Sequence, residues 1–194
     1  SGVPLEYFPV LLRVGVIMGL CGVLFCRMIF AFKKFFEWLK CSRFLKLALT
    51  FVTVAVIGYD SQLLFGGGND LVGQLAIQSH GVLLLGGIVL GKILLTTFCY
   101  GSGAQGGIFL PMLVIGASAG AFCEAVLSSI GIISPDFVPQ FVICAMGGML
   151  AAAMRTPILA ILLVLEMTNS FSNIYAIGIV TLVAYLVADL LKEP

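Results

Sequence analysis

Long apolar runs, separated by short polar or glycine-rich stretches, make up most of this chain. The runs predict helices over residues 10–36, 45–57, 82–100, 108–130, 137–154, 157–167 and 173–191. Pro157 suits the first turn of its helix, where a missing N–H costs nothing. The second helix should stop at Gly58, where a Gly-Tyr-Asp-Ser stretch begins. A glycine-rich turn, Gly66-Gly67-Gly68, and a short amphipathic piece over 71–78 should follow it.

Composition changes this picture from a helical protein to a membrane protein. Of the 194 residues, 61% are hydrophobic and only 10% are charged, and the mean hydropathy is +1.18. A soluble domain carries about 25% charged residues, so the excess apolar surface must face lipid. We therefore predict an all-α, polytopic integral membrane protein, in a plasma or inner membrane. The net charge of +1 offers no field that would attract nucleic acid.

The lengths of the runs point to transport. Several are too short to cross about 30 Å of hydrocarbon as one straight helix. In membranes, short or glycine- and proline-broken helices usually end at a cavity, where exposed backbone groups can bind an ion. Broken and tilted helices therefore favour a transporter over a simple membrane anchor.

Basic residues gather at one place along the chain. They surround the junction of the first two runs: Lys33, Lys34, Lys40, Arg43 and Lys46. The excess of positive charge on cytoplasmic loops predicts that this junction is cytoplasmic. The same residues would equally serve to end an amphipathic helix, and both readings give the same topology.

Side chains that catalyse reactions or bind metals form no cluster in the sequence. The six cysteines include no Cys-x-x-Cys pair and are predicted to be small buried hydrophobes. The single histidine, His80, is expected on a surface loop. Lys92 should face protein, water or a snorkelling route to the membrane surface. Glu124 should reach the membrane boundary near the turn at 131–135. We predict no enzyme activity, no catalytic residue, no metal site and no cofactor.

The glycine-rich strip at 101–107 carries the candidate chemistry. Its glycines allow tight turns and a close approach of backbone to a ligand, and a long apolar run follows at once. Several unpaired N–H groups and about half a positive charge of helix dipole would meet there, which makes an anion site. No basic side chain lies within the strip. Partial dipoles would offset dehydration of an ion without trapping it. A plain glycine-rich loop between two helices is the alternative.

The same strip carries a family resemblance. Gly107-Ile108-Phe109-Leu110-Pro111 resembles the GIFxP signature of the ClC family of chloride channels and chloride/proton antiporters. Further stretches resemble that family in the same order along the chain: the lead Ser102-Gly103-Ala104-Gln105-Gly106, the turn Gly66-Gly67-Gly68, the helix break Met154-Arg155-Thr156-Pro157, and Leu163-Val164-Leu165-Glu166-Met167-Thr168. Together these stretches cover essentially the whole sequence.

The resemblance implies a role for individual residues. Backbone N–H groups of Ile108 and Phe109 would bind the central chloride, and Leu110 would help Phe109 at an outer site. The helix start would be shaped by Gly106, Gly107 and Pro111. Met154 would pack beside, or gate, the ion pathway.

The resemblance also implies what surrounds the chain. Residues 1–194 would be the C-terminal half of an inverted-repeat transmembrane domain, with the first half and a final pore helix outside this sequence. A homodimer would form through the helices near 157–167 and 173–191, within the lipid bilayer. Chloride would be the transported ion. Channel and exchanger both remain open, because the proton-carrying glutamates of the family belong to the first half. The alternative is half of another inverted-repeat transporter, for other anions or carboxylates.

Overall fold

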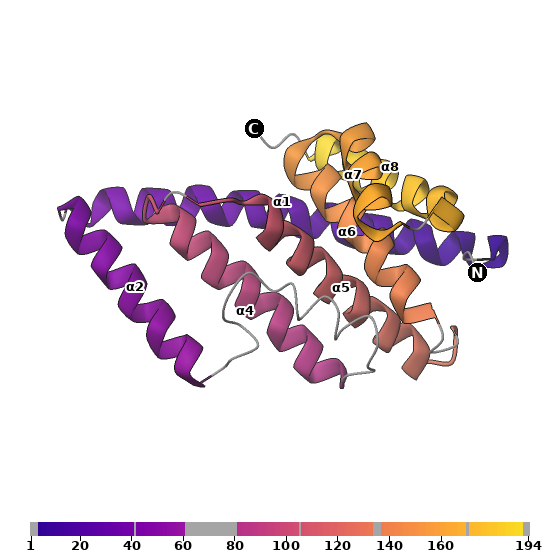
Figure 1. Cartoon of the computed structure of the whole chain (residues 1–194), viewed down its shortest axis with the longest axis horizontal. Coiled ribbons are helices and arrows are strands. Elements are labelled where there is room, and N and C mark those ends of the chain that lie inside the picture. Colours follow the sequence, from indigo (N-terminus) through magenta and orange to yellow (C-terminus); the bar gives the residue numbers. More distant parts are fainter. Residues whose placement is uncertain are drawn as a thin grey trace.

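The computed structural model describes residues 4–40, 42–60, 81–104, 106–133, 137–169 and 171–191, and this part contains helices and no strand (Figure 1). The elements are η1 (Leu5–Tyr7), α1 (Phe8–Trp38), α2 (Arg43–Asp60), α4 (Val82–Gly101), α5 (Phe109–Ser129), α6 (Val138–Met154), α7 (Pro157–Thr168), η4 (Phe171–Asn173) and α8 (Ile174–Leu190). The all-α prediction is confirmed. The predicted turn at 66–68, the amphipathic piece at 71–78 and His80 lie outside the described residues.

The predicted helix ends agree with the structure to within about two residues, except at the end of α2. That helix does not stop at Gly58 but continues to Asp60. A glycine inside a helix costs about 1 kcal/mol relative to alanine. In lipid, breaking the helix would cost more, because each unpaired backbone group there costs several kcal/mol. The expectation of a stop at Gly58 was therefore wrong.

Four stretches of the described chain are long and apolar enough to cross a membrane: Phe8–Trp38, Val82–Gly101, Phe109–Ser129 and Phe171–Leu190. Two shorter apolar helices, α6 and α7, complete the set. Large apolar side chains are exposed on many of these helices, for example Leu83, Ile158 and Leu186. Exposure of this kind is what a lipid-facing surface requires, and it confirms the prediction of a multi-pass membrane protein.

Helix α1 forms a long rod, and the C-terminal helices gather against its N-terminal part (Figure 1). Small residues let α8 approach it closely. A Cβ atom added at Gly15 would lie 2.7 Å from Cβ of Val183, and one added at Gly19 would lie 2.7 Å from Cβ of Val187. This glycine ridge is the helix-packing surface typical of membrane bundles.

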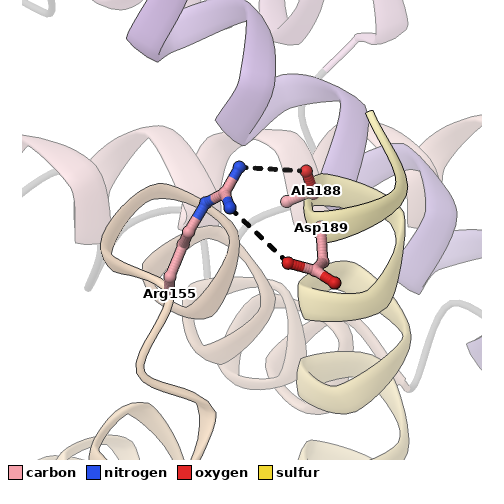
Figure 2. A network of polar contacts seen from close by, with 3 residues as sticks. All are labelled: Arg155, Ala188 and Asp189. Atoms are coloured by element: carbon pink, nitrogen blue, oxygen red, sulfur yellow. Dashed lines mark hydrogen bonds and ion pairs between the residues drawn. The ribbon is translucent and has the colours of Figure 1, made fainter. Parts of the chain in front are cut away.

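The break between α6 and α7 is held by a polar contact (Figure 2). Arg155 ends α6 in the left-handed conformation, with φ of 57°. Its Nη2 donates to the carbonyl oxygen of Ala188 at 3.3 Å, and its Nη1 lies 3.5 Å from Oδ1 of Asp189. A non-glycine residue in this conformation is uncommon. The guanidinium therefore ties a strained turn to the C-terminal end of α8.

The prediction of buried cysteines holds for two of the five described cysteines. Cys123 and Cys144 are buried, Cys21, Cys26 and Cys99 are half-buried, and all five are free thiols. The described residues hold no group of three or more metal-ligating side chains.

Candidate anion site at the N-terminus of α5

The site begins where α4 ends. Gly101 packs on α1 so closely that an added Cβ would lie 2.5 Å from Cβ of Phe32. The chain then turns at Gly103, whose φ of +84° favours glycine. The hydroxyl of Tyr100 donates to the carbonyl oxygen of Gly106, beyond the turn. This bond joins the last turn of α4 to the glycine strip, so the strip is fixed to a helix.

Helix α5 starts with amide groups that precede its backbone ladder. Within the described residues, the first backbone bond runs from the N–H of Met112 to the carbonyl of Ile108, at 3.2 Å. Phe109 and Leu110 come before Met112 in the first turn, so their N–H groups have no acceptor inside the helix. Pro111 carries no N–H at all. No side chain caps this helix. Among the described residues, no acceptor is found for the three consecutive N–H groups from Ile108 to Leu110.

The two glycines before the helix leave room beside their own backbone. Gly106 and Gly107 are exposed, and a Cβ added at either would meet no atom within 4 Å. Ile108, Phe109 and Leu110 are half-buried. In Figure 1, α4 ends near the C-terminal end of α1, whereas α5 begins nearer its middle. If α1 crosses the bilayer, α5 starts inside the membrane and not at its surface.

No full charge belongs to this helix start. The sequence has no ionisable acid or base between residues 101 and 123. The nearest in sequence are Lys92 on α4 and Glu124 near the far end of α5, both buried. The positive end of the α5 dipole, equivalent to about half a unit charge, is therefore the field that this stretch of the sequence itself supplies. Such an end attracts an anion of any kind.

The α5–α6 pair places Met154 relative to the site. The two helices are antiparallel. Gly120 of α5 lies against Phe141 and Ala145 of α6, and Gly116, one turn earlier, lies against Ala145 and Met149. When this register is continued along both helices, Met154, the last residue of α6, lies at the same height along the helix pair as Phe109, the first residue of α5. Met154 is 42% exposed in this chain. The structure thus brings Met154 to the level of the α5 N-terminus.

Comparison with known proteins identifies the family. The sequence profile of the family described as "Voltage gated chloride channel" matches residues 1–189. The chain belongs to this family. Its relatives include the H(+)/Cl(-) exchange transporter ClcA of Vibrio campbellii, which is 36% identical over 189 residues. That match covers 93% of this chain and 39% of the relative.

Other members agree with this assignment. The H(+)/Cl(-) exchange transporter ClcA of Yersinia pestis is 32% identical over 203 residues, covering 97% of this chain and 40% of the relative. The crystal structure of a slow cyanobacterial Cl-/H+ antiporter matches with a TM-score of 0.85 and 31% identity. The match covers 98% of the present chain and 45% of the antiporter chain. The present chain therefore spans less than half the length of these family members.

Two features of this chloride channel family member were not predicted from the sequence: the hydrogen bond of Tyr100 and the burial of Glu124. Tyr100 was not singled out, although a tyrosine directly before a glycine strip is well placed to hydrogen-bond the strip. The position of Glu124 at the membrane boundary stays a prediction. Its side chain is only 3% exposed, and its Oε1 has no partner among the described residues. It lies one turn beyond Gly120, on the face of α5 that packs against α6, which explains its burial.

Proposed function

We propose that residues 1–194 form the C-terminal half of a chloride-transporting membrane domain, and that chloride binds at the N-terminus of α5. The observation that carries the proposal is the run of three uncapped N–H groups at Ile108, Phe109 and Leu110. They follow the exposed Gly106 and Gly107, where an added Cβ would meet no atom within 4 Å. The names of the relatives, which are chloride/proton exchangers, support chloride as the ion.

The energetics suit conduction. Hydrogen bonds to a charged partner contribute about 1.5–3 kcal/mol each, so two or three amides can offset part of the dehydration of a chloride. A fixed ammonium or guanidinium in the same place would bind more deeply and release the ion more slowly. Partial dipoles without a full charge therefore favour rapid passage over storage.

The other residues of the site have supporting roles in this proposal. Gly106 and Gly107 leave room for the ion because they carry no side chain. Pro111 removes one amide that would otherwise need a partner, and it fixes φ near the value of a helix. Met154, level with Phe109, forms an apolar wall of the pathway. A thioether side chain can change rotamer at little cost, which suits a packing or gating position.

The complete function requires partners outside this chain. The missing first half of the domain would close the open side of the site, and it would carry the proton-coupling groups of a chloride/proton exchanger. We propose a homodimer through α7 and α8, because both present large apolar side chains on the outside: Ile158, Leu162, Leu182, Leu186 and Leu190. In this proposal the chain carries no catalytic residue and holds no cofactor, and chloride is its transported ligand.

The test removes one N–H without changing the side chain. In the full-length protein, Phe109 is replaced by phenyllactic acid, which turns the amide into an ester and deletes the donor. Chloride binding should weaken about tenfold or more, the equivalent of one charge-assisted hydrogen bond. Binding is measured by calorimetry, and chloride efflux is measured from proteoliposomes with the proton movement recorded alongside.

A matched control sits in the same chain. Ile158 is the second residue of α7, so its N–H also lacks a helical acceptor, and an ester there should leave chloride binding unchanged. Equal chloride affinity of the Phe109 ester and the natural protein would contradict the proposal. Absence of chloride flux in the full-length protein, with folding intact, would do so as well. Chloride flux without proton movement would assign a channel in place of an exchanger.

A further inference from the structure

The end of α1 lies at a membrane boundary. Helix α1 has 31 residues and is about 46 Å long at 1.5 Å per residue, whereas about 20 residues cross the hydrocarbon. The 20-residue span α4 ends at Gly101. Gly101 packs against Phe32 and the backbone N of Lys33. Two helices therefore place the boundary of the apolar layer near Lys33, and the last turns of α1 lie at or beyond it.

Five basic side chains are concentrated just past this boundary: Lys33, Lys34, Lys40, Arg43 and Lys46. The first four are exposed and Lys46 is half-buried. Between Lys33 and Lys46 the only acidic residue is Glu37. No ion pair to any of the five is found within the described part of the chain. The junction thus presents a net positive surface at the depth of lipid headgroups.

Large apolar side chains accompany the charges. Trp38 is 75% exposed and Phe44 is 82% exposed. Tryptophan is enriched at membrane–water interfaces, where its ring sits among the headgroups. This pairing of exposed aromatic and basic residues is typical of a surface that contacts lipid, and a purely water-facing helix end would not need it.

An apolar groove opens at the same junction. It has a volume of about 330 Å³ and is lined by Leu39, Leu45, Lys46, Ala48, Leu49 and Val52. Leu45, Leu49 and Val52 recur at helical spacing and form one stripe of α2. Among the described residues of the lining, Lys46 is the one that carries a charge. A ligand that joins an apolar chain to a negatively charged head would match both the apolar stripe and the charge of Lys46.

We infer that the α1–α2 junction is a binding site for an anionic phospholipid of the adjacent leaflet. The phosphate contacts the ammonium of Lys46, with Lys40 and Arg43 close by in sequence, and one acyl chain lies along Leu45, Leu49 and Val52. The long stem of a lysine can run along apolar surface while its head reaches a phosphate. Basic clusters beside a transmembrane helix attract anionic lipid by this electrostatic route.

The inference does not depend on chloride transport, so its test needs no flux. The full-length protein is purified from mixed micelles that contain equal amounts of phosphatidylglycerol and phosphatidylcholine. Retained lipid is counted by native mass spectrometry. The natural protein should retain phosphatidylglycerol in preference to phosphatidylcholine. Lys46→Gln should reduce this preference about fivefold, the effect of one basic residue near a membrane surface, and Lys46→Arg should preserve it.

Arg13→Gln is the matched control, because Arg13 is an exposed basic residue near the opposite end of α1. It removes the same charge from the other side of the membrane and should leave the preference unchanged. Leu49→Trp fills the groove without altering charge and should reduce retention of phosphatidylglycerol. Equal retention of the two lipids by the natural protein would overturn the inference. So would equal effects of Arg13→Gln and Lys46→Gln, or displacement of the lipid by millimolar inorganic phosphate.

Discussion

Because α5 and α6 are in close contact at Gly120, we predict that a larger side chain there destabilises the protein. A Cβ at this position would lie 2.6 Å from the carbonyl oxygen of Phe141 and 2.6 Å from Cβ of Ala145. Carbon atoms in contact normally lie about 3.5–4.0 Å apart, so Gly120→Val must push the two helices apart by about 1 Å. The carbonyl oxygen of Phe141 and Cβ of Ala145 cannot move away by a change of rotamer, because neither atom is the end of a flexible side chain.

The expected cost follows from these distances. Overpacking of a well-packed core costs about 1–3 kcal/mol. Valine forms helix better than glycine by a few tenths of a kcal/mol, which offsets only a small part. We expect Gly120→Val to destabilise the protein by about 2 kcal/mol. The same displacement should shift Met154 relative to Phe109, because both lie on this helix pair.

The assay is thermal unfolding of the full-length protein in detergent, followed by size-exclusion chromatography. Gly120→Val should lower the midpoint temperature by several degrees. Gly87→Val is the control, because Gly87 is an exposed glycine inside α4 and an added Cβ there meets nothing within 4 Å. The reasoning fails if the two variants unfold at the same temperature, or if Gly120→Val matches the natural protein.

Three further outcomes are expected. Tyr100→Phe removes the hydroxyl that donates to the carbonyl oxygen of Gly106. It should lower the free energy of unfolding by about 1 kcal/mol and weaken chloride binding. An unchanged chloride affinity, measured by calorimetry, would show that this bond does not position the glycine strip. Asp189→Asn should cost less than about 1 kcal/mol by thermal unfolding, since its pair with Arg155 is 35% and 59% exposed; a larger loss would mean that the pair is shielded in the complete protein. Cys144 is fully buried, so a maleimide should label it only after denaturation, as read by mass spectrometry of the digested protein.

Much of the fold could be predicted because lipid imposes simple rules on the sequence. Runs of apolar residues must form helices there, since backbone groups have no other partner. The break before Pro157 was also visible, because proline excludes the preceding residue from the helical conformation. What the sequence could not reveal is how that break is held. The contact from Arg155 to Asp189 joins residues 34 positions apart, and nothing local marks the pair.

The candidate site was predictable to a similar degree. A glycine strip before an apolar run indicates a helix N-terminus with free amides, and the helix begins at Phe109, one residue after the predicted start. The position of Met154 relative to Phe109 along the helix pair could not be derived from sequence. It depends on which residues of α6 contact Gly116 and Gly120. The burial of Glu124 could not be derived for the same reason. Its distance along the chain from a turn does not determine which face of α5 it occupies.

Bromide offers the most direct test of the central claim, that backbone amides at the start of α5 bind the transported anion. Crystals of the full-length protein are grown with bromide in place of chloride, and anomalous diffraction is measured at the bromine absorption edge. The account predicts an anomalous peak within hydrogen-bonding distance of the backbone nitrogens of Ile108 and Phe109. A peak that lies only beside a lysine or arginine side chain, with none at these nitrogens, would contradict it.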